Sequence, residues 1–252
     1  MRLERRENVP LALVAIAPLT AILAALVLAA GLIAAAGVNP LMAYSEMLRG
    51  ALGSRLSITE MFTRATPLIL TGLAAAVAFR ARLWNIGGEG QFYVGALMTA
   101  WVGHSLALPG PIGIAVLMVC GMAAGALLLA GPAFLRLRFG VDEVVTTLLL
   151  NFIVILFVGL MIEGPLRDPL AFGWPQSVPV DGDYRLSDLV PRTRLHIGLL
   201  FAIAAAGVIW LVLTRTVFGV ETRAAGLNAR AAAFAGISLP RTIMGVALVS
   251  GA

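Results

Sequence analysis

Long apolar runs are the feature of this sequence that most constrains its fold. One run covers residues 10–38, and two others cover residues 112–135 and 141–162. A helix needs about 20 mostly apolar residues to cross a bilayer. With 60% hydrophobic and 12% charged residues, this chain has more apolar surface than a soluble domain of 252 residues could bury. The sequence therefore predicts an all-α, polytopic transmembrane helical bundle.

We expect six full spans and the start of a seventh. The full spans are expected at residues 10–38, 65–79, 86–108, 112–135, 141–162 and 196–213. A short amphipathic helix is expected at residues 44–52, and the five prolines and four Asp of residues 163–195 favour an ordered external loop. The last apolar run, residues 242–252, is too short to cross a membrane. We therefore expect residues 1–252 to form one transmembrane permease domain that is truncated at its C-terminus.

Arginine placement predicts the orientation of these spans. Eleven of the 18 arginines fall on one side if the N-terminus is cytoplasmic, namely Arg2, Arg5, Arg6, Arg80, Arg82, Arg136, Arg138, Arg215, Arg223, Arg230 and Arg241. The other seven are then external, namely Arg49, Arg55, Arg64, Arg167, Arg185, Arg192 and Arg194. Positively charged residues of short loops favour the cytoplasmic side of a membrane most strongly. In this arrangement the arginine pairs at 80–82 and 136–138 lie in short loops on the cytoplasmic side. We expect a cytoplasmic N-terminus.

Composition also excludes several function classes. The chain contains no lysine, so it cannot form the Gly-Lys-Ser/Thr loop that holds ATP phosphates. Its arginines are scattered at helix ends, which argues against nucleic-acid binding. Two histidines and the single Cys120 cannot form a metal cluster or a Ser-His-Asp set inside a span. We expect no enzyme activity, no metal and no cofactor in this chain.

The glycine-rich stretch 85–91 is the most unusual part of the sequence. It places Asn85, Gly87, Gly88, Glu89, Gly90 and Gln91 at the mouth of a predicted span. Glycine in a helix costs about 1 kcal/mol relative to alanine, and a carboxylate at bilayer depth costs about 2.5–3.5 kcal/mol. One interpretation is an interfacial turn that keeps Glu89 in headgroup water. The other is a broken or closely packed helix beside a polar path, whose first amides could hold a polar substrate oxygen.

Two further features predict contacts between spans. Glu143, Thr147 and Asn151 have i, i+4, i+8 spacing and therefore share one face of a helix. Thr147 and Asn151 are candidates for the substrate path, but an inter-helix hydrogen bond explains Asn151 equally well. Gly121 and Gly125 form a small-xxx-small pattern that permits close packing of helices.

The polar segment 214–241 is expected to be a cytoplasmic loop containing a short helix. Asn228 is the expected N-cap residue, and Gly236 and Pro240 are expected to stop the helix. A short helix between two spans is suited to docking a soluble partner. The alternative is an interfacial helix that rests on lipid headgroups.

These features, in this order, resemble the inner-membrane permeases of the branched-chain amino acid and simple-sugar branch of ABC importers, and most closely the nucleoside or simple-sugar permeases. The matching stretches are residues 67–73 (PLILTGL), 84–91 (WNIGGEGQ), 140–147 (GVDEVVTT) with 150–151 (LN), 164–169 (GPLRDP), 223–228 (RAAGLN) and 235–237 (AGI). Family members commonly carry Phe at position 84 and a residue other than Gly at 88. They also continue for several further spans.

The resemblance implies a division of labour in a bacterial inner membrane. Two permease subunits form the pore, cytoplasmic ATP-binding subunits bind the ATP, and an extracytoplasmic solute-binding protein delivers solute to the outer loops, here residues 39–64 and 163–195. Glu89, Gln91 and Asn151 would lie near the path of a small polar solute. The ATPase-coupling residues would be those around the short helix, namely Arg223, Gly226, Leu227, Asn228, Arg230, Ala235 and Gly236.

Two other classes of membrane protein are alternatives to an ABC permease. An ion-coupled secondary transporter would use Glu89 as its titrating carboxylate, but it would need further acids in the middle of other spans. A membrane scaffold without transport activity would leave the 85–91 cluster and the short helix at 228–235 without a role.

Overall fold

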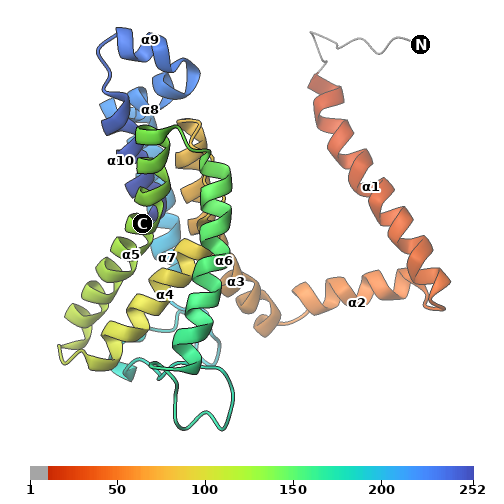
Figure 1. Cartoon of the computed structure of the whole chain (residues 1–252). Coiled ribbons are helices and arrows are strands. Elements are labelled where there is room, and N and C mark those ends of the chain that lie inside the picture. Colours follow the sequence, from red (N-terminus) through yellow and green to blue (C-terminus); the bar gives the residue numbers. More distant parts are fainter. Residues whose placement is uncertain (1–10) are drawn as a thin grey trace. The chain divides into compact units, whose positions relative to one another are not determined.

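The computed structural model describes residues 11–252, with side chains from residue 16 onward. Within these residues the chain forms ten α-helices and one 3₁₀ turn, and no strand (Figure 1). The helices are α1 (Leu11–Ala35), α2 (Pro40–Leu52), α3 (Arg55–Arg80), α4 (Gly88–Ser105), α5 (Gly110–Phe139), α6 (Glu143–Glu163), α7 (Gly198–Arg215), α8 (Val217–Leu227), α9 (Ala229–Phe234) and α10 (Leu239–Gly251). The predicted all-α bundle is confirmed. Arg2, Arg5 and Arg6 lie outside the described residues.

The chain divides into two compact units, with the boundary inside α3 between Met61 and Phe62. In the first unit, α1 and α2 form a helical hairpin in which the Tyr44 hydroxyl donates to the Leu26 carbonyl at 2.6 Å. Asn39 caps α2 because its side chain accepts from the Leu41 amide at 3.0 Å. The short amphipathic helix expected at 44–52 is therefore present, and it begins one turn earlier, at Pro40.

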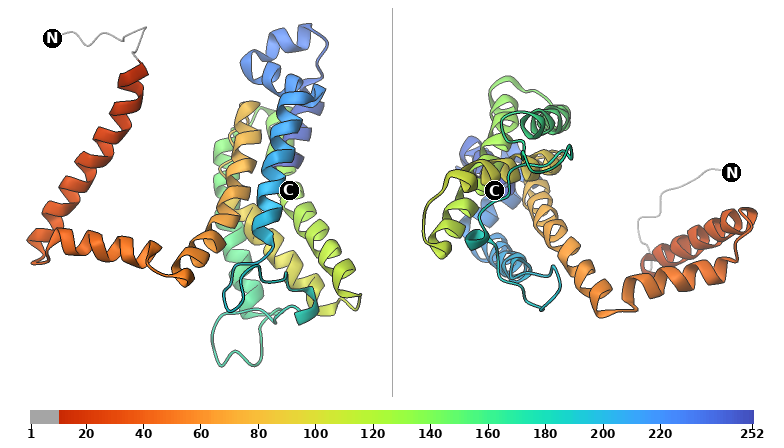
Figure 2. Two further views of the ribbon diagram at one scale, coloured as in Figure 1. Left: turned by 180° about the vertical axis from the view of Figure 1, so that it is seen from behind. Right: turned by 90° about the horizontal axis from the view of Figure 1, so that it is seen from below.

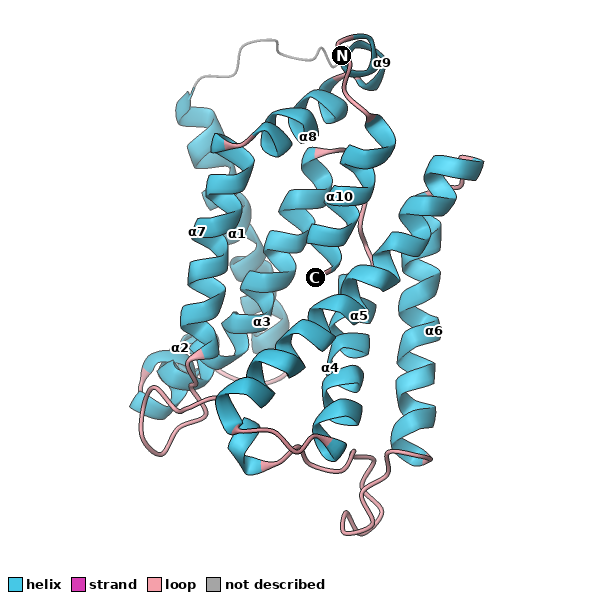
Figure 3. Ribbon diagram, turned by 90° about the vertical axis from the view of Figure 1, so that its left-hand side faces the viewer, coloured by secondary structure: helices cyan, strands magenta, loops and turns pink. Residues whose placement is uncertain are grey.

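The second unit contains α3 from Phe62 onward and all helices from α4 to α10. Helix α4 packs against α5 and α6, and α10 packs against α5 (Figure 3). A buried core near one end of this unit joins α3, α5, α7 and α10. Its residues are Val77, Ala78, Ala81, Leu83, Leu129, Ala133, Leu213, Val246 and Ala247.

Five helices of the described chain are long and apolar enough to cross a membrane: α1, α3, α5, α6 and α7. The expected span at 86–108 is present as α4, which has 18 residues but is less apolar because it contains Glu89, Gln91 and His104. The last apolar run forms α10, a helix of 13 residues. These lengths make the chain a multi-pass membrane protein.

Two expected helix boundaries are wrong. We expected the second span to begin at Ala65, but α3 begins at Arg55 and passes through Pro67. Polar residues fit inside this helix because Thr59 and Thr66 donate their hydroxyl hydrogens to carbonyls one turn earlier, at 3.0 Å. Pro240 does not stop a helix either, because it occupies the first turn of α10, where a missing N–H is harmless.

The loop 164–197 connects α6 to α7 and lies beyond the helix ends (Figure 2). Asp168 orders its first part by accepting from the Leu170 amide at 2.9 Å and the Gln176 side chain at 3.1 Å. Tyr184 fixes its second part, since the Tyr184 hydroxyl lies 2.9 Å from the Leu106 carbonyl and 2.9 Å from the Leu108 amide. This loop is therefore ordered, as expected, and it is hydrogen-bonded to the turn between α4 and α5 through Tyr184.

Candidate functional site

The site is built around residues 81–87, the non-helical linking segment that joins α3 to α4. Burial alternates along it: Ala81, Leu83, Asn85 and Gly87 are buried, while the residues between them are exposed. Helix α4 therefore begins well inside the second unit, beside the middle of α5 and α6 (Figures 1 and 3). The glycine-rich stretch therefore contains the end of a buried non-helical connection and the first turn of α4, which is continuous from Gly88 to Ser105.

Helix α6 binds the end of the linking segment that leads into α4. The Asn151 side chain donates to the Ile86 carbonyl at 2.8 Å and accepts from the Gly90 amide at 2.8 Å. The Thr147 hydroxyl accepts from the Ile86 amide at 3.3 Å. Glu143, Thr147 and Asn151 are all buried on one face of α6, as their spacing predicted. Asn151 thus makes inter-helix hydrogen bonds, which the sequence predicted as the alternative to a direct role in the substrate path.

A second cluster of side chains joins the linking segment to α10. The Asn85 and Gln91 side chains exchange two hydrogen bonds, at 2.9 and 3.1 Å, and Asn85 also donates to the Ser250 hydroxyl at 3.1 Å. Ser250 donates in turn to the Ala74 carbonyl at 2.7 Å. Asn85 is not the N-cap residue of α4, a role that belongs to Gly87. Instead, Asn85 connects α4 and α10.

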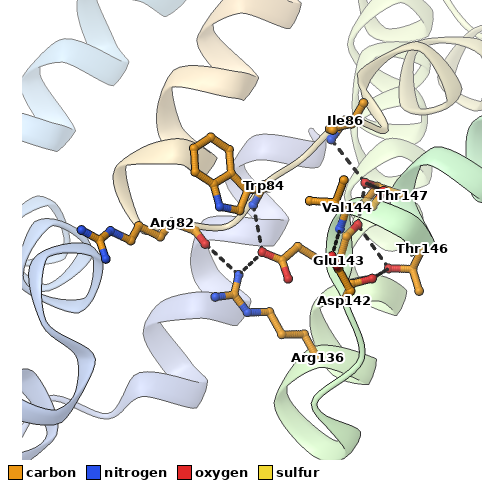
Figure 4. A network of polar contacts seen from close by, with 9 residues as sticks. All are labelled: Arg82, Trp84, Ile86, Arg136, Asp142, Glu143, Val144, Thr146 and Thr147. Atoms are coloured by element: carbon orange, nitrogen blue, oxygen red, sulfur yellow. Dashed lines mark hydrogen bonds and ion pairs between the residues drawn. The ribbon is translucent and has the colours of Figure 1, made fainter. Parts of the chain in front are cut away.

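An ion pair binds the part of the linking segment that follows α3 (Figure 4). Arg136, in the last turn of α5, donates to Glu143 at 2.6 Å and to the Arg82 carbonyl at 2.8 Å. Glu143 accepts from the Trp84 amide at 3.2 Å through the same oxygen. The pair is mostly shielded, because the Arg136 and Glu143 side chains are 28% and 10% exposed. Screening by solvent is therefore weaker here than at a surface pair.

Two glycines permit the close approach of these elements. A Cβ atom on Gly90 would lie 2.7 Å from the Asn151 side-chain oxygen, and one on Gly87 would lie 3.2 Å from the Thr147 Cβ. Gly88 has open space around it. Packing against α6 therefore requires the glycine at 90 and leaves little space for a side chain at 87, whereas it does not constrain Gly88.

Glu89 differs from its neighbours because its side chain is exposed on the second unit and bonds to no other described residue. It lies near the level of Asn151, since the adjacent Gly90 contacts that residue. From Glu143 to Asn151, α6 rises by about 12 Å at 1.5 Å per residue. A carboxylate at that depth of a span requires water or a polar partner beside it.

A cavity of about 380 Å³ opens between α3, α4, α5 and α10. Its walls are mainly apolar, and its polar groups come from Thr71, Gln91, Thr99 and Ser250. The sequence predicted Gln91 only. Thr71, Thr99 and Ser250 gave no separate signal, because isolated hydroxyl residues within apolar helices commonly bond to their own backbone.

The short helix predicted in the segment 214–241 is α9, and Asn228 is its N-cap, accepting from the Ala231 amide at 3.1 Å. Gly236 ends it in the left-handed region with φ +88°. Arg223, Leu227 and Arg230 are exposed, whereas Gly226 is buried with its Cα against the Arg80 carbonyl. Ala235 follows α9 directly as its C-cap. Residues 226–229, at the end of α8 and the start of α9, form the α8–α9 turn. This turn thus contacts Arg80, the residue just before the linking segment.

Comparison with known proteins identifies the family. The family described as "Branched-chain amino acid transport system / permease component" matches residues 57–252. The chain belongs to this family. Its permease component is a transport class rather than an enzyme class, and the resemblance seen in the sequence is confirmed.

Several curated relatives of this permease are ABC transporter permeases. It is 34% identical to the glucose ABC transporter permease protein TsgB13 of Haloferax volcanii, over 100% of this chain and 69% of the relative. It is 34% identical to the guanosine ABC transporter permease protein NupP of Bacillus subtilis and 35% identical to the nucleoside ABC transporter permease protein NupB of Lactococcus lactis. Those matches cover 93% of this chain and 68% and 67% of the relatives. No solved structure matches the permease.

Proposed function

We propose that this permease is the membrane subunit of an ABC importer for a small, neutral, polar solute, either a nucleoside or a simple sugar. The observation that carries the proposal is the family match over residues 57–252, to which the cavity between α3, α4, α5 and α10 adds a place for the solute. The named solutes of the relatives, glucose, guanosine and nucleosides, are all uncharged molecules rich in hydroxyl groups. This chemistry selects the class of solute but not its identity.

The proposed path includes the cavity between α3, α4, α5 and α10. Its volume of about 380 Å³ lies within the usual range of small-molecule sites. Hydroxyl and amide groups on apolar walls would hydrogen-bond a neutral solute weakly, as a transporter requires for release. Gln91 contributes directly to the cavity, and Glu89, which is exposed and follows the cavity-lining Gly88, would offer a carboxylate beside it. Asn85, Thr147 and Asn151 act on the path by holding residues 85–91 in place.

The importer requires partners because this chain contains no lysine and hence no phosphate-binding loop of the Gly-Lys-Ser/Thr type. We propose that cytoplasmic ATP-binding subunits dock on α9 and that a second permease subunit completes the pore. An extracytoplasmic solute-binding protein would contact the external loops, including residues 164–197. The arginine pairs at 80–82 and 136–138 support a cytoplasmic N-terminus in a bacterial inner membrane.

The test is reconstitution of the native-length permease with its ATP-hydrolysing and solute-binding partners in proteoliposomes. Uptake of a labelled nucleoside or sugar is measured with ATP, with a non-hydrolysable analogue and with an imposed proton gradient. We expect uptake that requires hydrolysis and is indifferent to the gradient. Gradient-driven uptake by the permease alone would contradict the proposal and favour ion coupling through Glu89. Competition among nucleosides, hexoses and pentoses then identifies the solute.

A further inference from the structure

The linking segment contacts two parts of the permease that are expected to work together. At its beginning, the Arg80 and Ala81 backbone lies directly against Gly226, two residues before the N-cap of α9. At its end, Asn85 bonds to Gln91 and Ser250, which line the cavity. The same seven residues therefore lie between the proposed ATPase-docking helix and the proposed solute path.

The segment has little freedom to absorb a displacement between these two ends. Ala81 and Leu83 are buried in the core formed by α3, α5, α7 and α10. Asn85 is hydrogen-bonded on both sides, and the Ile86 backbone is held by Thr147 and Asn151. Close-packed regions transmit strain rather than deform gradually. A shift of the α8–α9 turn against Arg80 is thus expected to reach the cavity residues.

The Arg136–Glu143 pair anchors the linking segment between its α3 end and its α4 end. It binds the Arg82 carbonyl and the Trp84 amide, so it attaches both α5 and α6 to the segment (Figure 4). Arg82 adopts φ +53°, in the left-handed region that a non-glycine residue rarely occupies. That conformation requires support, and the bond from Arg136 to the Arg82 carbonyl is placed to give it.

We propose that Arg136 and Glu143 are positioning residues for transport: by holding residues 82–84, they make the linking segment the element that couples the α8–α9 turn to the solute cavity. They touch neither solute nor ATP. Loss of the pair would let the segment yield locally, so ATP-driven movement of α9 would no longer reach Asn85, Gln91 and Ser250. This inference depends on the proposed function, because coupling has meaning only for an ATP-driven importer.

The test measures solute transported per ATP hydrolysed in proteoliposomes containing the complete transporter. The variants are Glu143→Gln and Arg136→Gln, and the matched control is Arg138→Gln. Arg138 is at the same end of α5, is exposed, and its side chain bonds to none of the described residues. We expect the transported-to-hydrolysed ratio to fall by about fivefold or more in both variants, with hydrolysis within about twofold of wild type. The control keeps the wild-type ratio.

A second variant, Gly226→Ala, approaches the same coupling from the other end of the segment. Its new methyl group would meet the Arg80 carbonyl and displace the α8–α9 turn, so a lower ratio is expected here too. A wild-type ratio in Glu143→Gln and Arg136→Gln would overturn the proposal. A proportional loss of hydrolysis, uptake and assembled complex would also overturn it, because the pair would then only stabilise the fold. Failure of the proposed function looks different, since the wild-type complex itself would show no ATP-dependent uptake.

Discussion

At the scale of single residues, the glycine-rich stretch separates into two kinds of side chain. Asn85 and Gln91 are buried and bonded within the protein, while Glu89 is exposed and unbonded among the described residues. A buried polar group that is fully hydrogen-bonded fixes structure, whereas an exposed carboxylate at membrane depth needs a polar environment. The same seven-residue stretch therefore supplies both buried, hydrogen-bonded side chains and one exposed carboxylate.

We predict that Glu89→Gln lowers uptake by about tenfold without reducing membrane insertion, because a hydrogen bond to a charged group contributes roughly 1.5–3 kcal/mol. Uptake and the amount of inserted protein are measured side by side. The control is Glu163→Gln, at the exposed opposite end of α6. Wild-type uptake by Glu89→Gln would remove this carboxylate from the path.

We predict that Asn151→Leu destabilises the permease by about 1–3 kcal/mol, because the Ile86 carbonyl and the Gly90 amide lose their partner. The midpoint of thermal unfolding in mild detergent is the measurement. Phe152→Leu is the control, since that neighbouring side chain is 59% exposed. An unchanged midpoint for Asn151→Leu would mean that water or the chain itself replaces both bonds.

At the scale of elements, the crossings of α5 with α4 and α10 depend on small residues. Gly121 lies against Thr99 and the Gly95 backbone of α4, and Gly125 lies against the Gly251 carbonyl of α10. The small-xxx-small pattern therefore does permit close packing, with two different helices. These crossings determine the shape of the cavity, which both helix pairs enclose.

We predict that Gly125→Ala destabilises the permease by about 1–3 kcal/mol, because the added methyl group would overlap the Gly251 carbonyl. Gly131→Ala, on the same helix, has no atom within 4 Å of the new Cβ and is expected to be neutral or slightly stabilising. Thermal unfolding of the two variants in the same detergent gives the comparison. Equal midpoints would show that α10 moves away at little cost.

We predict that Arg230→Glu weakens docking of the ATP-hydrolysing partner by about tenfold at low salt and by less at high salt, since exposed charges are screened. Partner binding is measured by titration into nanodiscs containing the permease. Arg194→Glu, on the loop between α6 and α7, reverses an exposed charge elsewhere and should not change binding. Unchanged affinity and coupled hydrolysis in Arg230→Glu would show that α9 is not the docking element.

At the scale of the whole molecule, the orientation in the membrane rests on arginine placement. We predict that a membrane-impermeant thiol reagent labels Trp174→Cys in intact cells, and labels Arg138→Cys only after the membrane is opened. Both positions are exposed, and the background is Cys120→Ala, which removes the single native thiol. The reverse labelling pattern would place the N-terminus outside.

The sequence alone determined the features that depend on local patterns. Apolar runs of sufficient length predicted the membrane helices, and Asn228 with Gly236 predicted α9, because hydropathy and capping act within a few residues. Local patterns failed at the start of α3, where Thr59, which bonds to carbonyls of its own helix, resembles a residue of a polar loop. They also failed at Pro240, because a proline begins a helix as readily as it follows one.

Only the tertiary structure decided how the glycine-rich stretch is used. Asn85 meets Ser250 across 165 residues, and Gly90 meets Asn151 across 61, so no local pattern could reveal either contact. The cavity has the same origin, since its hydroxyl groups come from three separate helices. The sequence thus determined which helices form and that residues 85–91 are unusual. The packing of α5, α6 and α10 around residues 81–87 determined which polar groups are hydrogen-bonded inside the protein and which remain exposed.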